Sequence, residues 1–130
     1  MIATKKFTLC ALAFAAAAIA APASASAWDQ IGQRVVTDRA DFDEVWVEGH
    51  RRYTAIKLCV YDHPVHFYDL DIRFANGGHQ DARVRVRINP GECTRAIDLK
   101  GGARDIRNVK LVYEEASAAR ARATVRVFAQ

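Results

Sequence analysis

HFYDLDIRFANGGHQDARVRVRI, residues 66–88, contains two runs of alternating apolar and polar residues, separated by the residues NGG at 76–78. Successive side chains of a β-strand point to opposite faces, so this alternation predicts two strands that each bury one face. Asn and Gly are turn residues, and they separate the two predicted strands. The first run is expected to place four side chains on one face: Tyr68, Leu70, Ile72 and Phe74.

The same period of two recurs along most of the chain after Trp28. The alanine-rich residues 114–123 favour a helix by composition, but their last arginines alternate with apolar residues, so we expect a turn near Ser117 and then a strand. Seven or eight short strands predict an all-β fold, an antiparallel β-sandwich, with a small β-barrel as the alternative. Further strand candidates are residues 35–37, 44–48, 53–62, 94–99, 108–114 and 122–128.

The first 27 residues have the composition of a secretory signal peptide. Their apolar stretch is shorter than a membrane-spanning helix. We therefore expect cleavage after Ala27, a single β-sandwich domain over residues 28–130, no transmembrane segment after cleavage, and a periplasmic or secreted location. The parts of the leader are a positive start at Lys5 and Lys6, an apolar run over residues 7–20, and small residues at 25–27.

Two cysteines, Cys59 and Cys93, remain after the leader. An even pair of cysteines outside the cytoplasm usually forms a disulfide, and closing this loop would stabilise the fold by about 3 kcal/mol. The alternation of the strand argues against this disulfide, because Leu58 and Val60 mark the buried face and Cys59 points to the opposite face. The disulfide therefore requires that both faces of this strand are partly covered or that a bulge intervenes.

Arginines dominate the second half of the chain, where residues 83–130 carry eleven Lys/Arg against five Asp/Glu. If the strand at 82–88 and the last strand lie in one sheet, their arginines form a candidate anion-contacting patch. The ordinary interpretation is a solvated face of exposed strands. Nucleic acid is not expected as a partner, because few aromatic residues accompany these cations. The patch comprises Arg83, Arg85, Arg87, Arg120, Arg122 and Arg126.

Histidine and aspartate residues cluster between positions 62 and 71, and such residues are ligands for zinc or copper. His63, His66 and Asp69 are the candidate ligands if the chain is a periplasmic metal-binding protein. On an extended strand, His63 and His66 fall on opposite faces, and only a turn at Pro64 brings them together. We therefore expect no bound metal and no cofactor.

Nucleophilic catalysis has little support. The only serine after the leader is Ser117, which lies in a predicted turn without a Gly-x-Ser-x-Gly motif. A small hydrolase with a pair of acidic residues is a second alternative, which needs a cleft that a domain of this size seldom offers. We expect a non-enzymatic, envelope-associated binding or accessory domain, with anionic envelope components or another protein as candidate partners.

A Trp-Asp-Gln-Ile-Gly start and a sequence of strand blocks extend over most of the chain after the leader. The most specific block is IDLKGGARDIRNVKLVY, residues 97–113, a strand, a glycine-rich turn, an arginine and a strand that ends in tyrosine. The chain thereby resembles the YaaI-like family of small secreted bacterial proteins, a domain of unknown function. The resemblance implies an exported β-rich domain and brings no activity and no catalytic residues.

Overall fold

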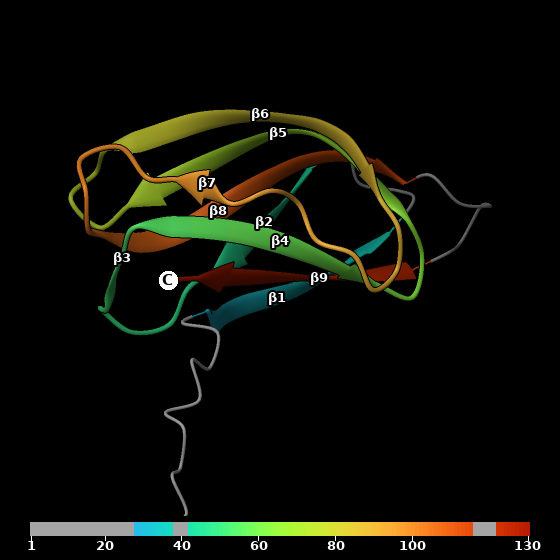
Figure 1. Ribbon diagram of the computed structural model, residues 1–130, viewed down its shortest axis with the longest axis horizontal. Helices are drawn as coiled ribbons and strands as arrows, with labels where there is room; N and C mark the ends of the chain where they lie inside the picture. The colour runs from blue at the N-terminus through green and yellow to red at the C-terminus, as the bar shows by residue number, and fades with distance from the viewer. Residues whose placement is uncertain (1–27, 38–41, 116–121) are drawn as a thin grey trace, which may run out of the picture.

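The computed structural model describes residues 28–37, 42–115 and 122–130. Two antiparallel sheets pack face to face, one with the strand order β1-β9-β4-β7 and the other with the order β2-β8-β5-β6, where β3 also pairs with β8 (Figure 1). The predicted β-sandwich is confirmed, and the described strands do not close into a barrel. The strands are β1 (Asp29–Thr37), β2 (Phe42–Trp46), β3 (Arg52–Tyr53), β4 (Ala55–Tyr61), β5 (Val65–Phe74), β6 (His79–Ile88), β7 (Ile97–Asp98), β8 (Arg104–Glu115) and β9 (Arg122–Ala129).

The predicted signal peptide, the turn at Ser117 and Arg120 lie outside the described residues. Within the described part of the chain, no helix has the length and apolar character needed to cross a membrane.

The core lies between the two sheets and consists of aliphatic and aromatic side chains from their inner faces. β-branched and aromatic residues favour strands because they pack well on a pleated surface. Full burial of one Val, Leu, Ile or Phe side chain contributes about 1.5–3 kcal/mol, so the inner faces supply the main stabilising term. The largest fully buried side chains include Phe67, Ile56, Leu58, Leu70, Ile72, Ile106 and Leu111.

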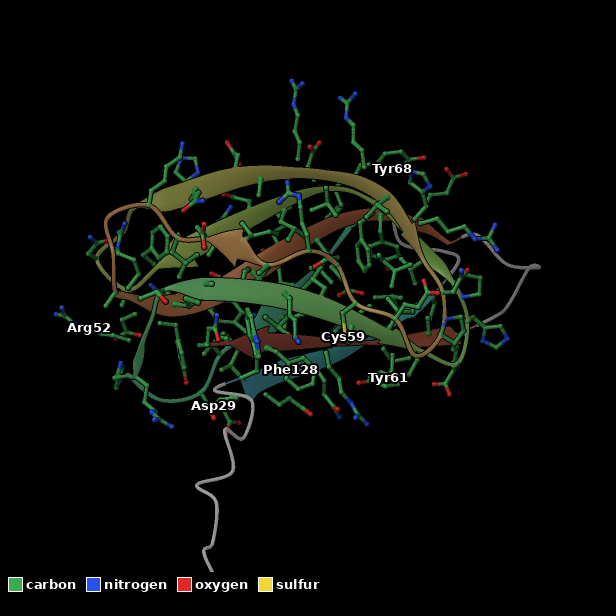
Figure 2. The ribbon with its side chains drawn as sticks, viewed as in Figure 1. Asp29, Arg52, Cys59, Tyr61, Tyr68 and Phe128 are labelled. Atoms are coloured by element: carbon green, nitrogen blue, oxygen red, sulfur yellow. A yellow bond between two sulfur atoms is a disulfide. The ribbon has the colours of Figure 1, made fainter. Side chains whose placement is uncertain are left out.

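β5 departs from the predicted alternation at Tyr68. Its pairing with β8 shifts between Phe67 and Asp69, so that β5 contains one more residue than β8 at this point. Such a bulge reverses the phase of the strand. Phe67 takes the buried position, and Tyr68 is 37% exposed on the outward side of β5 (Figure 2). The prediction that Tyr68 shares the buried face with Leu70 is therefore wrong.

The Cys59–Cys93 disulfide is present in the structure (Figure 2). β4 is buried on both faces at this point, because Leu58 and Val60 are fully buried toward the core and Cys59 is 3% exposed on the other side. Of the two arrangements that a disulfide required, coverage of both faces is the one observed.

The chain between β6 and β7 crosses from one sheet to the other and runs along the edge of β4. Backbone hydrogen bonds join Gly91 N to Val60 O at 2.8 Å, Val60 N to Glu92 O at 3.0 Å, and Thr94 N to Leu58 O at 2.7 Å. The disulfide lies within this stretch, so a covalent bond and backbone hydrogen bonds together hold the crossing segment on β4.

Candidate functional site

The outward-facing side of the β2-β8-β5-β6 sheet, here called the outer face, carries polar and aromatic side chains in rows that the strand register sets. One row runs across all four strands through Trp46, Asn108, Arg73 and His79. The next row runs through Glu44, Lys110, Asp71 and Asp81. Residues that directly oppose each other on neighbouring antiparallel strands have Cβ atoms about 5 Å apart, so these rows bring distant parts of the sequence into contact.

An open hollow of about 560 Å³ lies on the outer face. This volume falls within the range of small-molecule sites, about 300–1,000 Å³. Backbone turns with Gly77 and Gly78 form one part of its wall. Its polar and aromatic lining comes from four strands: Trp46, Asp71, Arg73, Phe74, His79, Arg107 and Asn108.

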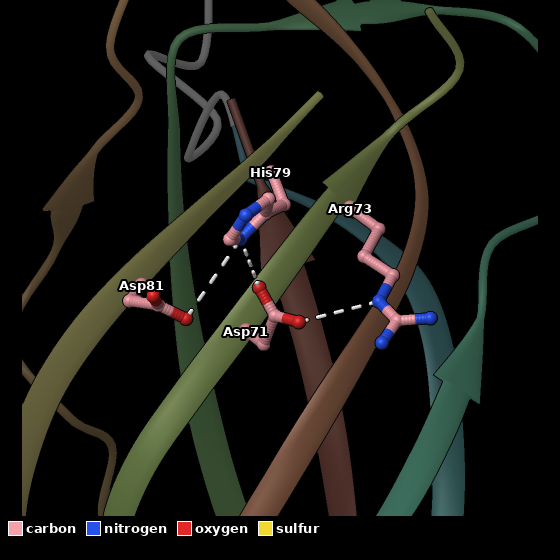
Figure 3. Close-up of polar contacts among 4 residues, drawn as sticks. All are labelled: Asp71, Arg73, His79 and Asp81. Carbon is pink, nitrogen blue, oxygen red and sulfur yellow. Dashed lines mark hydrogen bonds and ion pairs between the residues drawn. The ribbon is translucent and has the colours of Figure 1, made fainter. Parts of the chain in front are cut away.

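Asp71 is the centre of a charged cluster at one side of the hollow (Figure 3). Arg73 Nε donates to Asp71 Oδ2 at 3.2 Å, and His79 Nδ1 lies 2.9 Å from Asp71 Oδ1. The same His79 nitrogen lies 3.9 Å from Oδ1 of Asp81. Partial burial raises the pKa of Asp71, but hydrogen bonds from Arg73 and His79 outweigh it, so the pKa is lowered from its ordinary value. Asp71 is therefore ionised near neutral pH.

Asp71, His79 and Asp81 are the described residues that could hold a metal ion, because one ligand atom from each lies within 4.8 Å of the others. An imidazole with two carboxylates suits zinc and similar divalent metals. In the structure, however, Asp71 already pairs with Arg73 and has His79 as a hydrogen-bond partner, and the Asp81 side chain is 76% exposed. These polar contacts account for the cluster without a metal.

Asn108 lines the hollow and is only 2% exposed, so it lies at the base of the hollow. Its Nδ2 atom is buried and has no hydrogen-bond partner among the described residues. A buried donor without a partner destabilises a fold by about 1–3 kcal/mol. Because this nitrogen has almost no accessible surface, it is not open to a ligand in the hollow.

Trp46 and Arg107 form the wall beside Asn108. The indole of Trp46 is 57% exposed, which is unusual for so large an apolar group. The Arg107 guanidinium carbon lies 5.9 Å from the centre of the Trp46 ring. The Arg107 side chain makes no hydrogen bond to any described residue, so all its N–H groups are available to a ligand.

The predicted arginine patch is divided between the two sheets. Arg83, Arg85 and Arg87 lie on β6, whereas Arg122 and Arg126 lie on β9 in the other sheet. None of these residues lines the hollow. The structure therefore does not bring the described members of the patch into one sheet.

The three predicted metal-ligand candidates have separate surroundings. His63 Nδ1 lies 2.7 Å from the backbone oxygen of Arg122, and the His66 ring lies 4.9 Å from the ring of Tyr68. Asp69 pairs with Arg83 in the register of β5 and β6. The cluster that the structure forms contains none of the three.

Sequence reasoning missed Trp46, Arg107 and Asn108 as site residues. A signal for Trp46 existed, because it shares a strand face with Glu44 and Glu48 in the alternating segment. Asn108 gave no signal, since its burial depends on its neighbours on other strands, Trp46 and Arg73.

Comparison with known proteins gives a family and a structural similarity. A family described as Domain of unknown function (DUF2541) matches residues 7–129. No curated protein matches the chain significantly. Among solved structures, AlgX of Pseudomonas aeruginosa is similar, with a TM-score of 0.46 and 12% sequence identity over 78% of this chain and 26% of that chain. A TM-score below 0.5 does not establish a shared fold, so the fold assignment rests on the strands and their pairing.

The match supports the expectation of an uncharacterised small domain. The narrower resemblance to the YaaI-like family stays a prediction.

Proposed function

The chain belongs to the DUF2541 family, and we propose that it is an exported, non-enzymatic binding domain of the cell envelope that holds its ligand in the hollow of the outer face. The observation that carries this proposal is the exposed indole of Trp46, which lines the hollow beside the guanidinium of Arg107. A concave site that combines an apolar aromatic surface with a few polar groups is typical of ligand binding.

Export is supported by the composition of residues 1–27 and by the disulfide. Disulfides form and persist in oxidising compartments outside the cytoplasm. An uncharacterised β-rich domain with a disulfide fits an exported accessory protein.

A non-enzymatic role is supported by the chemistry of the hollow. Asp71 is held in its ionised form by Arg73 and His79, so it is a poor proton donor near neutral pH. Both cysteines of the described chain are in the disulfide, which removes the thiolate that a cysteine nucleophile needs.

The test starts from the full-length chain, expressed with its leader and recovered from the extracytoplasmic fraction. Mass spectrometry should find Trp28 at the N-terminus. The recovered protein is mixed with an envelope fraction and sedimented. The unmodified protein should sediment with the envelope, and the Trp46→Ala variant should stay in the supernatant, because it removes the exposed aromatic surface that lines the hollow.

Phe42→Ala is the matched control. Phe42 lies on the same strand as Trp46 and is 58% exposed, but it does not line the hollow, so this variant should sediment normally. Equal sedimentation of all three proteins would exclude the hollow as the binding site, and failure of the unmodified protein to sediment would contradict envelope binding. Release of soluble fragments by the unmodified protein but not by Trp46→Ala would contradict the non-enzymatic role.

A further inference from the structure

We propose that the ligand of the hollow is a saccharide that carries a carboxylate group. This inference rests on the proposed function above and adds the chemical class of the ligand. It follows from the hydrogen-bonding groups that the hollow leaves unused and from the exposed indole beside them.

The unused groups of the hollow are mainly donors. The Arg107 side chain lines the hollow and makes no hydrogen bond to a described residue. Arg73 uses its Nε on Asp71, and its two Nη groups make no hydrogen bond to the described residues. A ligand that satisfies these donors must be rich in acceptors, and guanidinium groups bind carboxylates through paired, charge-assisted hydrogen bonds.

The acidic side chain of the hollow does not offset this preference. Both oxygens of Asp71 already accept a hydrogen bond, one from Arg73 and one from His79. Arg73 and Asp71 offset each other's charge, so a negatively charged ligand meets the guanidinium of Arg107 and the remaining N–H groups of Arg73.

His79 adds one acceptor for a ligand hydroxyl. Its Nδ1 faces the Asp71 carboxylate, which favours the tautomer with the proton on Nδ1. In this tautomer Nε2 carries a lone pair, and Nε2 makes no hydrogen bond to the described residues. The hollow can thus accept a hydrogen bond from a hydroxyl group as well as donate to a carboxylate.

The indole of Trp46 favours ligands that have an apolar face in addition to a hydroxyl group and a carboxylate. It offers a flat apolar surface at the wall of the hollow, with the Arg107 guanidinium near its ring. The C–H face of a pyranose ring packs on such a surface, while the ring hydroxyls and a carboxylate reach the surrounding polar groups. A sugar acid unites the apolar face, the hydroxyls and the charge in one ring.

The experiment uses trigalacturonate and its fully methyl-esterified form as probes. The two trisaccharides share rings and hydroxyls and differ in charge. Binding to the mature protein is measured by calorimetry at low and moderate salt. We expect the unmodified protein to bind the acid about tenfold more tightly than the ester, the factor expected for the loss of one charge-assisted hydrogen bond.

Two variants separate charge recognition from ring recognition. Arg107→Gln should reduce the preference for the acid several-fold and leave the affinity for the ester nearly unchanged. Trp46→Ala should weaken both probes. Arg87→Gln, which removes a positive charge from the same sheet outside the hollow, is the control and should change neither.

Equal affinity for acid and ester would overturn the proposal, because the charge would then play no part. Binding of hexaglutamate as tightly as trigalacturonate would also overturn it, since charge alone would suffice. Absence of trisaccharide binding, in a protein whose sedimentation with the envelope still requires Trp46, would overturn the ligand class while leaving the proposed function intact. Thermal unfolding of each variant verifies that the fold is retained.

Discussion

Asp71 and Asp81 lie directly opposite each other on β5 and β6, and the Nδ1 atom of His79 lies between their carboxylates, 2.9 Å from one and 3.9 Å from the other. Like charges that oppose each other across two strands destabilise a sheet. Arg73 and His79 counter this repulsion at Asp71, whose side chain is 22% exposed. The exposed Asp81 has the longer contact to His79.

The two aspartates should respond differently to loss of charge. Asp81→Asn relieves the repulsion and breaks only a long contact, so the free energy of unfolding should change by less than about 0.5 kcal/mol or rise slightly. Asp71→Asn leaves Arg73 and His79 without their carboxylate and should lower the free energy of unfolding by about 1 kcal/mol. Urea unfolding at pH 7 measures both. A larger loss for Asp81→Asn than for Asp71→Asn would contradict this account.

Acid should weaken the fold through Asp71. The pKa of Asp71 is lower in the folded chain than its ordinary value of 3.8, so its ionised form contributes stability above that pH. This contribution is lost as the pH falls below 3.8 and through the folded pKa. The difference in free energy of unfolding between the unmodified protein and Asp71→Asn should therefore shrink in this range. A difference that stays constant from pH 7 to pH 2 would show that the carboxylate is not stabilised by its charge.

Zinc should bind the Asp71, His79 and Asp81 cluster weakly. A metal would have to separate His79 from Asp71, and His79 and Asp81 are exposed to water. Protein purified without chelator should contain less than one zinc ion per chain by elemental analysis. Added zinc should leave the melting temperature nearly unchanged in the unmodified protein, in His66→Ala and in His79→Ala. A zinc-dependent rise that disappears only in His79→Ala would instead identify a metal site.

Tyr68 should ionise at unusually high pH. Its hydroxyl donates a hydrogen bond to Glu114, and this bond, followed by burial and by the charge of Glu114, raises the pKa of Tyr68 above 10.0. Absorbance titration of the four tyrosines should show one late step that is absent in Tyr68→Phe. Glu114→Gln removes the negative charge and should move this step toward 10. An unchanged step in Glu114→Gln would show that the charge of Glu114 has no influence.

The arginines of β6 should be dispensable for binding at the hollow. Replacement of Arg83, Arg85 and Arg87 by Gln keeps the polar character of this edge strand, and exposed substitutions change stability by about 0.5 kcal/mol or less each. None of the three lines the hollow, so sedimentation with the envelope should persist. Loss of sedimentation at an unchanged melting temperature would make β6 a binding surface.

The alternation along the chain after Trp28 was sufficient to predict an all-β fold of short strands, because period two is a local property of the chain. The position of Tyr68 was not predictable in the same way. Its bulge arises from the pairing of β5 with β8, a strand about 40 residues later, and no local pattern specifies that register. The pairing of Cys59 with Cys93 has the same origin, since residues 91–94 reach the edge of β4 from another part of the chain.

The candidate site depends still more on pairing. Trp46, Asn108, Arg73 and His79 come from four strands, and they form one row only because β2 pairs with β8 and β8 with β5. The described members of the predicted arginine patch lie in two sheets for the same reason. Whether β6 and β9 share a sheet is decided by strand order, which alternation does not encode.

The segment from Gly91 to Thr94 has a protective consequence. It occupies the backbone groups of Leu58 and Val60 that β4 would otherwise expose, on a strand that is apolar along most of its length. An uncovered strand of this kind is a template for intermolecular pairing and aggregation. Since Cys93 fastens the segment, reduction of the disulfide should make the protein prone to self-association at β4, and oxidation is then a safeguard against misassembly as well as a source of stability.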